Sequence, residues 1–213
     1  MENRSIRRPE TTLAWLAIMV ILAWFALATQ FKLLIDSGKA DLPELIIRYF
    51  SFFTILTNIL VALYCTVILL SPRSRPGRYF SRLSTVTAIT FYIVIVGATY
   101  NILLRFLWNP EGLQKVVDEL LHTVIPSLFL LYWLIFIPKT GLKWSAIFPW
   151  MIFPLVYIIY SLIRGSFTGY YPYPFIDVSL YGLGHVLLNS VLFTAAFFVL
   201  ALLFIGVAKK IGR

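Results

Sequence analysis

The chain has little of what a soluble domain or a metal site needs. Its 213 residues include one cysteine, two histidines and nine acidic residues, and charged residues make up only 13%. The single cysteine, Cys65, excludes an intrachain disulfide and any metal site built from several cysteines. With 60% hydrophobic residues beside so few charges, the composition predicts an integral membrane protein. We expect no metal and no cofactor.

What is present is a series of long apolar runs. A hydrocarbon layer of ~30 Å needs about 20 mainly apolar residues per helix. The sequence therefore predicts an all-α integral membrane protein, a six-transmembrane-helix bundle that forms one membrane domain over residues 1–213. The first run contains a triplet, Ala26-Leu27-Ala28, like that of a cleaved signal, but it continues to Ile35, so we expect an uncleaved helix. The six runs lie near 13–35, 45–70, 84–107, 119–137, 145–163 and 181–207.

The charges between these runs predict an orientation. Basic residues concentrate in the cytoplasmic loops of membrane proteins, and here most of the 18 fall on the side that holds both ends of the chain. We expect a multi-pass membrane protein with cytoplasmic N and C termini. The basic residues form no patch interleaved with aromatics, so no nucleic acid is expected, and no protein partner is predicted. The cytoplasmic set is Arg4, Arg7, Arg8, Arg73, Arg75, Arg78, Arg82, Lys139, Lys143, Lys209, Lys210 and Arg213.

Polar residues form stripes at the opposite ends of four runs. Residues three, four or seven apart share one face of a helix. A strongly polar side chain in hydrocarbon costs a few kcal/mol unless it is partnered, so such stripes predict a functional site. The stripes are Ser51, Thr54 and Asn58, entered from Arg48; Asn101 and Arg105; Asp118 and His122; and His185 with Asn189.

Three of these residues fit nucleophilic catalysis. A serine hydroxyl becomes a good nucleophile when a histidine, oriented by a third group, removes its proton. Ser51, His122 and Asp118 meet this requirement by residue type and depth. The other polar residues are candidates to bind substrate or stabilise an oxyanion. These substrate-binding candidates are Arg48, Asn58, Asn101, Arg105, His185 and Asn189.

Structural interpretations stand beside the functional ones. A serine in a membrane helix commonly bonds its own backbone or a neighbouring helix, which would account for Ser51. Asp118 lies near the start of a predicted helix, where an acidic residue favours the helix dipole. His185 lies close to Gly182 and Gly184, where helices approach closely and an interhelical hydrogen bond forms readily.

Four stretches of the sequence resemble one protein family. The stretches Arg48-Tyr-Phe-Ser-Phe-Phe-Thr-Ile-Leu-Thr-Asn58, Asp118-Glu-Leu-Leu-His-Thr-Val-Ile-Pro126, Trp150-Met-Ile-Phe-Pro-Leu-Val-Tyr157 and Tyr171-Pro-Tyr-Pro-Phe-Ile-Asp177 are similar to the bacterial branch of the androgen-induced (androgen-dependent) membrane protein family. Vertebrate members are six-helix proteins that hydrolyse fatty-acid esters of hydroxy fatty acids with an intramembrane threonine and histidine. The resemblance implies that His122 is the base and places Ser51 at the threonine position. Thr54, one turn further on, is the alternative nucleophile.

Together these observations predict an intramembrane hydrolase of lipid acyl esters whose site opens to the outer leaflet. Its substrate would be a membrane lipid or a lipid-like molecule. One alternative is a non-catalytic protein that binds or transports a lipid or solute. Another is a haem membrane protein in which His122 and His185 are the two axial ligands.

Overall fold

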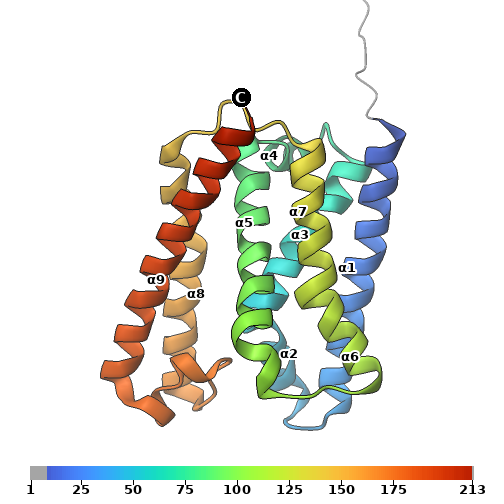
Figure 1. Ribbon diagram of the computed structural model, residues 1–213. Helices are drawn as coiled ribbons and strands as arrows, with labels where there is room; N and C mark the ends of the chain where they lie inside the picture. Colours follow the sequence, from blue (N-terminus) through green and yellow to red (C-terminus); the bar gives the residue numbers. More distant parts are fainter. Residues whose placement is uncertain (1–8, 213) are drawn as a thin grey trace, which may run out of the picture. The chain divides into compact units, whose positions relative to one another are not determined.

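The computed structural model describes residues 9–212, and within this range every element is helical and no strand occurs (Figure 1). Six helical segments in it are long and apolar enough to cross a membrane. The prediction of an all-helical protein with six candidate membrane spans is therefore confirmed. The cytoplasmic location of the two termini stays a prediction. Four basic residues behind that prediction, Arg4, Arg7, Arg8 and Arg213, lie outside the described residues.

The chain divides into two compact units. The first consists of the residues up to Lys39 together with Thr54–Ile137, and the second of Ala40–Phe53 together with the residues from Pro138 onward. The division separates the predicted site residues. Thr54, Asn58, Asn101, Arg105, Asp118 and His122 belong to the first unit, and Arg48, Ser51, His185 and Asn189 belong to the second.

In the first unit α7 packs against both α1 and α5. Buried hydroxyl and indole groups also bond between helices: Tyr64 of α3 and Tyr132 of α7 share a hydrogen bond of 3.2 Å, and Trp133 Nε1 of α7 donates to Thr87 Oγ1 of α5 at 3.0 Å. Such bonds satisfy polar groups that would otherwise be stranded among apolar side chains. The helices of this unit are α1 (Glu10–Asp36), α3 (Phe53–Leu70), α4 (Arg75–Phe80), α5 (Leu83–Thr99), α6 (Gly112–Glu119) and α7 (Ile125–Phe136).

The second unit contains α2 (Leu42–Phe50) and a packed pair of long helices, α8 (Ile147–Thr168) and α9 (Val178–Ile211). Asp177 caps α9, because its side chain accepts hydrogen bonds from the main-chain N–H groups of Ser179 and Leu180. Gly182, with φ of 75°, kinks α9 near its start. A positive φ costs a glycine little, since it has no Cβ.

The structure interrupts the run predicted at 45–70. Helix α2 ends at Phe50 and α3 begins at Phe53, so Ser51 lies at the break. Ser51 Oγ donates to Ile47 O at 2.7 Å, and Ser51 O accepts a hydrogen bond from Tyr157 at 2.9 Å. Side-chain hydroxyls therefore compete with the helical ladder for main-chain oxygens before the break and at it. An apolar run reveals none of this, because it reports hydropathy and not hydrogen bonding.

The third and fourth spans also depart from regular α-helix. Two short π-helical turns, η1 (Tyr100–Leu104) and η3 (Leu120–Val124), follow α5 and α6. The fourth helical stretch begins at Gly112 and not near 119 as predicted. Hydropathy did not locate these first turns because they include polar residues. One of these, Gln114, donates to Gln30 of α1 at 2.9 Å. π-Helical turns are rare in proteins, and those that do occur are often found at functional sites.

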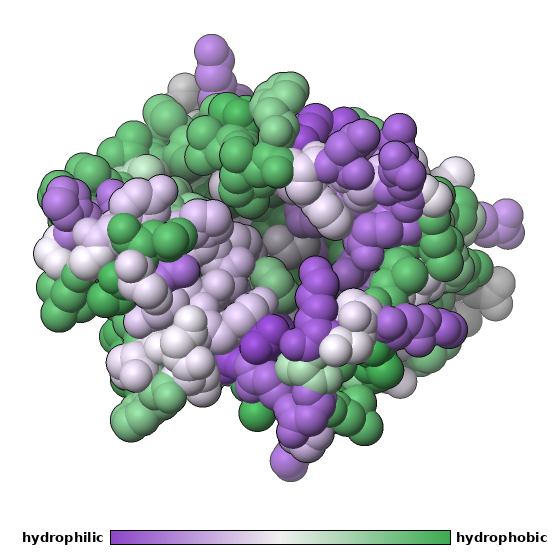
Figure 2. Space-filling model, turned by 90° about the horizontal axis from the view of Figure 1, so that it is seen from below, coloured by the Kyte–Doolittle hydropathy of each residue, from purple (hydrophilic) through white to green (hydrophobic). Residues whose placement is uncertain are grey.

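Figure 2 views the molecule from the end at which α1 finishes and α6 begins. Hydrophilic residues gather at this end among hydrophobic ones. This is the pattern expected where apolar helices end and polar loops begin.

Candidate functional site

The strongest candidate site in the first unit is centred on His122. Its Nδ1 lies 2.9 Å from the main-chain oxygen of Asp118 and 3.3 Å from the carboxyl Oδ1 of the same residue. Tyr100 donates its hydroxyl proton to Asp118 Oδ2, and its ring stacks on the imidazole with centroids 4.0 Å apart. Asp118 is only 3% exposed. These three residues, Tyr100, Asp118 and His122, are called the histidine cluster below.

The histidine cluster has the connectivity of a general base. In hydrolytic triads a carboxylate holds one imidazole nitrogen and leaves the other to take the proton of the nucleophile. Here Asp118 engages Nδ1 of His122, and Nε2 makes no hydrogen bond to the part of the chain that the structure describes. The imidazole is therefore oriented on one side and available on the other.

A proline and a glycine explain why the chain bends into a π turn at His122. Pro126 has no N–H, so it cannot bond to the oxygen of His122 four residues earlier. That oxygen accepts instead from Asn101 Nδ2 at 3.1 Å. Gly97 makes the approach of the two segments feasible, because a Cβ there would lie 3.0 Å from Pro126 Cβ and 3.1 Å from His122 O. Asn101, predicted to bind substrate, thus positions the backbone of the histidine.

Asn58 likewise donates to a main-chain oxygen of this turn, that of Leu121, the residue before His122. In the π turn the N–H of Ile125 bonds to Leu120 O, which leaves Leu121 O without its usual helical donor. Asn58 Nδ2 donates to that oxygen at 3.2 Å and to Thr54 O at 2.9 Å. Asn58 Oδ1 is buried and makes no hydrogen bond to the described residues. An unpaired buried carbonyl oxygen beside the histidine segment is a further polar group available to a ligand or a water.

Arg105 ties the two π turns together. Its guanidinium donates to Asn101 Oδ1 at 3.0 Å, to Thr123 Oγ1 at 3.1 Å and to Glu119 Oε2 at 2.7 Å. The sequence placed Arg105 among the substrate-binding candidates. In the structure its hydrogen bonds go to neighbouring side chains, which makes it part of the scaffold of the histidine cluster.

Ser51 lies in the second unit and is 1% exposed. Its Oγ donates to Ile47 O and lies 3.1 Å from the hydroxyl oxygen of Tyr160. Thr54 lies in the first unit, in the first turn of α3, and is half-buried. The pairing of either hydroxyl with His122 stays a prediction.

Two further predicted residues lie on α9, and Arg48 lies in α2. Asn189 donates to Phe175 O at 3.0 Å and thereby fixes the loop that precedes α9. His185 is exposed, and its side chain makes no hydrogen bond to the described residues. Its predicted role, in binding or as a haem ligand, stays a prediction. Within residues 9–212 no group of three or more His, Cys, Asp or Glu side chains lies close enough to hold a metal ion.

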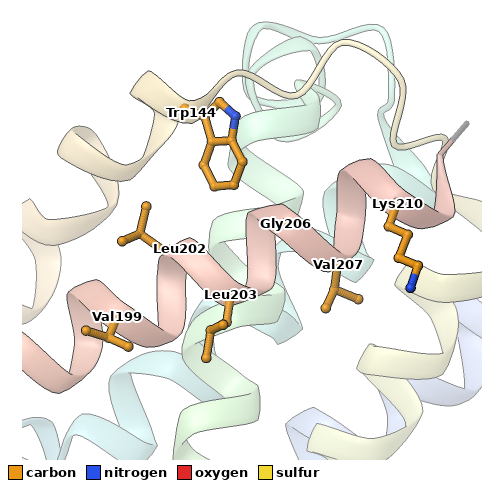
Figure 3. Close-up of a pocket in the computed structure, with 7 residues that line it drawn as sticks. All are labelled: Trp144, Val199, Leu202, Leu203, Gly206, Val207 and Lys210. Carbon is orange, nitrogen blue, oxygen red and sulfur yellow. The ribbon is translucent and has the colours of Figure 1, made fainter.

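A groove of about 520 Å³ lies on the second unit along the last turns of α9 (Figure 3). Val199 and Lys210 lie toward its two ends along α9, and Trp144 lies opposite the aliphatic residues between them, such as Leu203. None of the predicted site residues lines it. Its surface is almost wholly apolar, as expected of a helix face that meets lipid.

Sequence reasoning missed Tyr100, the residue that bonds Asp118 and covers the imidazole. The sequence does show Tyr100 next to Asn101, but a tyrosine near the end of a membrane helix is commonly an interface anchor. Only the tertiary contact of Tyr100 in η1 with Asp118 in α6 and His122 in η3 distinguishes the two roles. Comparison of the chain with family models, curated proteins and solved structures gives no match.

Proposed function

We propose that the protein is an intramembrane hydrolase of lipid acyl esters, of the kind formed between a fatty acid and a hydroxy fatty acid. The observation that carries the proposal is the histidine cluster: Asp118 holds Nδ1 of His122, and Nε2 is left without a partner among the described residues. Resemblance of the stretches around Arg48 and Asp118 to the androgen-induced membrane protein family supports the same chemistry.

The proposed reaction follows the logic of a serine hydrolase. A hydroxyl, from Ser51 or from the alternative Thr54, attacks the ester carbonyl while His122 Nε2 accepts its proton. The tetrahedral intermediate then expels the alcohol, which takes that proton from His122. A water molecule, deprotonated by His122, then attacks the acyl-enzyme. The fatty acid is released, and the oxygen of the nucleophile takes the proton back from His122. Asp118 stabilises the imidazolium at each proton transfer, and Tyr100 holds the carboxylate in place.

The test is hydrolysis of long-chain esters of hydroxy fatty acids by the purified full-length protein. His122→Ala removes the base, and we expect turnover to fall by a factor of about 10³ or more. Asp118→Asn leaves the size of the side chain unchanged but removes its charge, and we expect at least about a hundredfold loss. Full activity of the His122→Ala protein would refute the proposal.

Two further comparisons make the test specific. Ser51→Ala and Thr54→Val identify the nucleophile, because only one of them should abolish acyl-enzyme formation. Asp36→Asn is the matched control for Asp118→Asn: Asp36 also pairs with a residue four positions away on its helix, Lys32, but lies exposed at the end of α1. We expect this control to hydrolyse esters at the wild-type rate.

A further inference from the structure

Two arginines in the second unit share one carboxylate. Glu44 Oε1 accepts a hydrogen bond from Arg48 Nε at 2.8 Å and another from Arg164 Nη2 at 2.7 Å. The guanidinium carbons of Arg48 and Arg164 lie 4.2 and 4.8 Å from the centroid of the Tyr170 ring. These four residues, Glu44, Arg48, Arg164 and Tyr170, are called the arginine pair cluster below.

The arginine pair cluster carries an excess of positive charge. The hydrogen bond from Arg48 lowers the pKa of Glu44 below its usual value, so this carboxylate is ionised at neutral pH. Burial raises the pKa of Tyr170, so the phenol is neutral. Two guanidinium groups therefore face one carboxylate. Arg164 is only 8% exposed, and a buried charge without a counter-charge is costly.

Some N–H donors of the two arginines in the cluster also have no hydrogen-bond partner among the described residues. Arg48 bonds Glu44 through Nε, and its two terminal nitrogens make no hydrogen bond to the described residues. Arg164 Nε is buried and likewise unpaired within residues 9–212. Because a guanidinium presents parallel N–H groups, the free edge of Arg48 matches the two oxygens of a carboxylate or phosphate.

The cluster lies close to the depth at which lipid headgroups are expected. Arg164 is in the last two turns of α8, which ends at Thr168, and Arg48 is in α2, which is not one of the six candidate membrane spans. Both positions are thus near the end of a span, close to the level of headgroups. Stacking on Tyr170 restricts the motion of both guanidinium groups.

We propose that the arginine pair cluster binds one oxyanion, a carboxylate or phosphate group, through the free edge of Arg48 and the excess charge of Arg164. The anion belongs to a lipid headgroup or is free in solution. The inference goes beyond ester hydrolysis and does not depend on it, because none of the cluster residues belongs to the histidine cluster.

The test uses the full-length protein with His122→Ala, so that methyl oleate is not hydrolysed to oleate. It measures the thermal stabilisation of this protein in a neutral detergent by three probes: oleate, methyl oleate and inorganic phosphate. Oleate and methyl oleate have the same chain, so their difference reports the carboxylate alone. A ligand that binds only the folded protein raises the unfolding midpoint, and at a given concentration the rise is larger for a lower dissociation constant. We expect the dissociation constant of oleate to be at least about tenfold lower than that of methyl oleate.

Variants test which residues cause the preference for oleate over methyl oleate. Arg48→Gln and Arg164→Gln are each expected to remove it, and Arg75→Gln, an exposed arginine of the first unit with the same change in charge, is expected to keep it. If Arg164→Gln does not fold, Arg48→Gln alone decides, since the Arg48 side chain is 24% exposed. Competition by phosphate supports a free anion as ligand, and its absence supports a lipid headgroup. Equal binding of oleate and methyl oleate, or a preference that survives Arg48→Gln, would overturn the proposal.

Discussion

His122 Nδ1 lies 3.3 Å from Asp118 Oδ1, one helical turn earlier in the chain. The second carboxyl oxygen of Asp118 accepts from Tyr100, whose ring also covers the imidazole. The orientation of the histidine is therefore set by two different helical segments, each of which contains a π turn.

Tyr100→Phe should destabilise the protein while it keeps the ring that stacks on His122. The substitution removes the hydroxyl that donates to buried Asp118, and loss of such a hydrogen bond costs about 1–3 kcal/mol. Unfolding of the purified protein in detergent measures the difference. Tyr181→Phe, at an exposed tyrosine of α9, is the control and should change stability by less than about 0.5 kcal/mol. If the two variants unfold alike, the Tyr100 hydroxyl contributes nothing.

Gly165→Ala should be destabilising because of one aromatic ring. A Cβ at Gly165 would lie 1.9 Å from Tyr171 Cε1, so the ring and its loop must move. We expect a loss of about 1–3 kcal/mol in unfolding free energy. Gly184→Ala is the matched control in the other long helix of this unit, because a Cβ there meets nothing within 4 Å, and it should be neutral or stabilising by up to about 1 kcal/mol. A Gly165→Ala protein as stable as the control would show that Tyr171 does not pack as described.

Glu44 should make stability depend on pH in the acidic range. Its folded pKa is lowered by Arg48, so its contribution is fully present above the unfolded value of 4.5 and is lost as pH falls through the folded pKa. We therefore expect wild type to be more stable than Glu44→Gln at pH 7, with a difference that shrinks progressively below pH 4.5. Thermal unfolding of both proteins at a series of pH values measures this. A difference that stays constant down to the most acidic pH would contradict the ion pairs of Glu44.

The sequence predicted the helical class, but few of the contacts that the candidate residues make. Hydropathy alone locates six runs, because a helix that crosses lipid must be apolar over most of its length. The spacing of Asp118 and His122 also predicts their contact, since residues four apart share a face. The helix break at Ser51 was not predicted, because it depends on a hydroxyl from Tyr157, over a hundred residues away in the chain.

The sequence also did not predict what Asn58, Asn101 and Arg105 contact. Their residue types indicate polar recognition, and the sequence assigned them to substrate. In the structure their donors go largely to backbone oxygens and side chains around the two π turns. A sequence shows that a polar group in an apolar helix needs a partner, but it does not show whether that partner is a ligand or the protein itself.

The sequence by itself determined that this chain is helical and rich in segments long and apolar enough to cross a membrane, because backbone hydrogen bonding and apolar length are properties of each segment alone. Tertiary structure decided which polar groups meet: Tyr100 with Asp118, Asn101 with the oxygen freed by Pro126, and Glu44 with Arg164. Each of these pairs joins different segments of the chain. Their contact follows from how closely helices pack, which small residues such as Gly97 allow and no local pattern encodes.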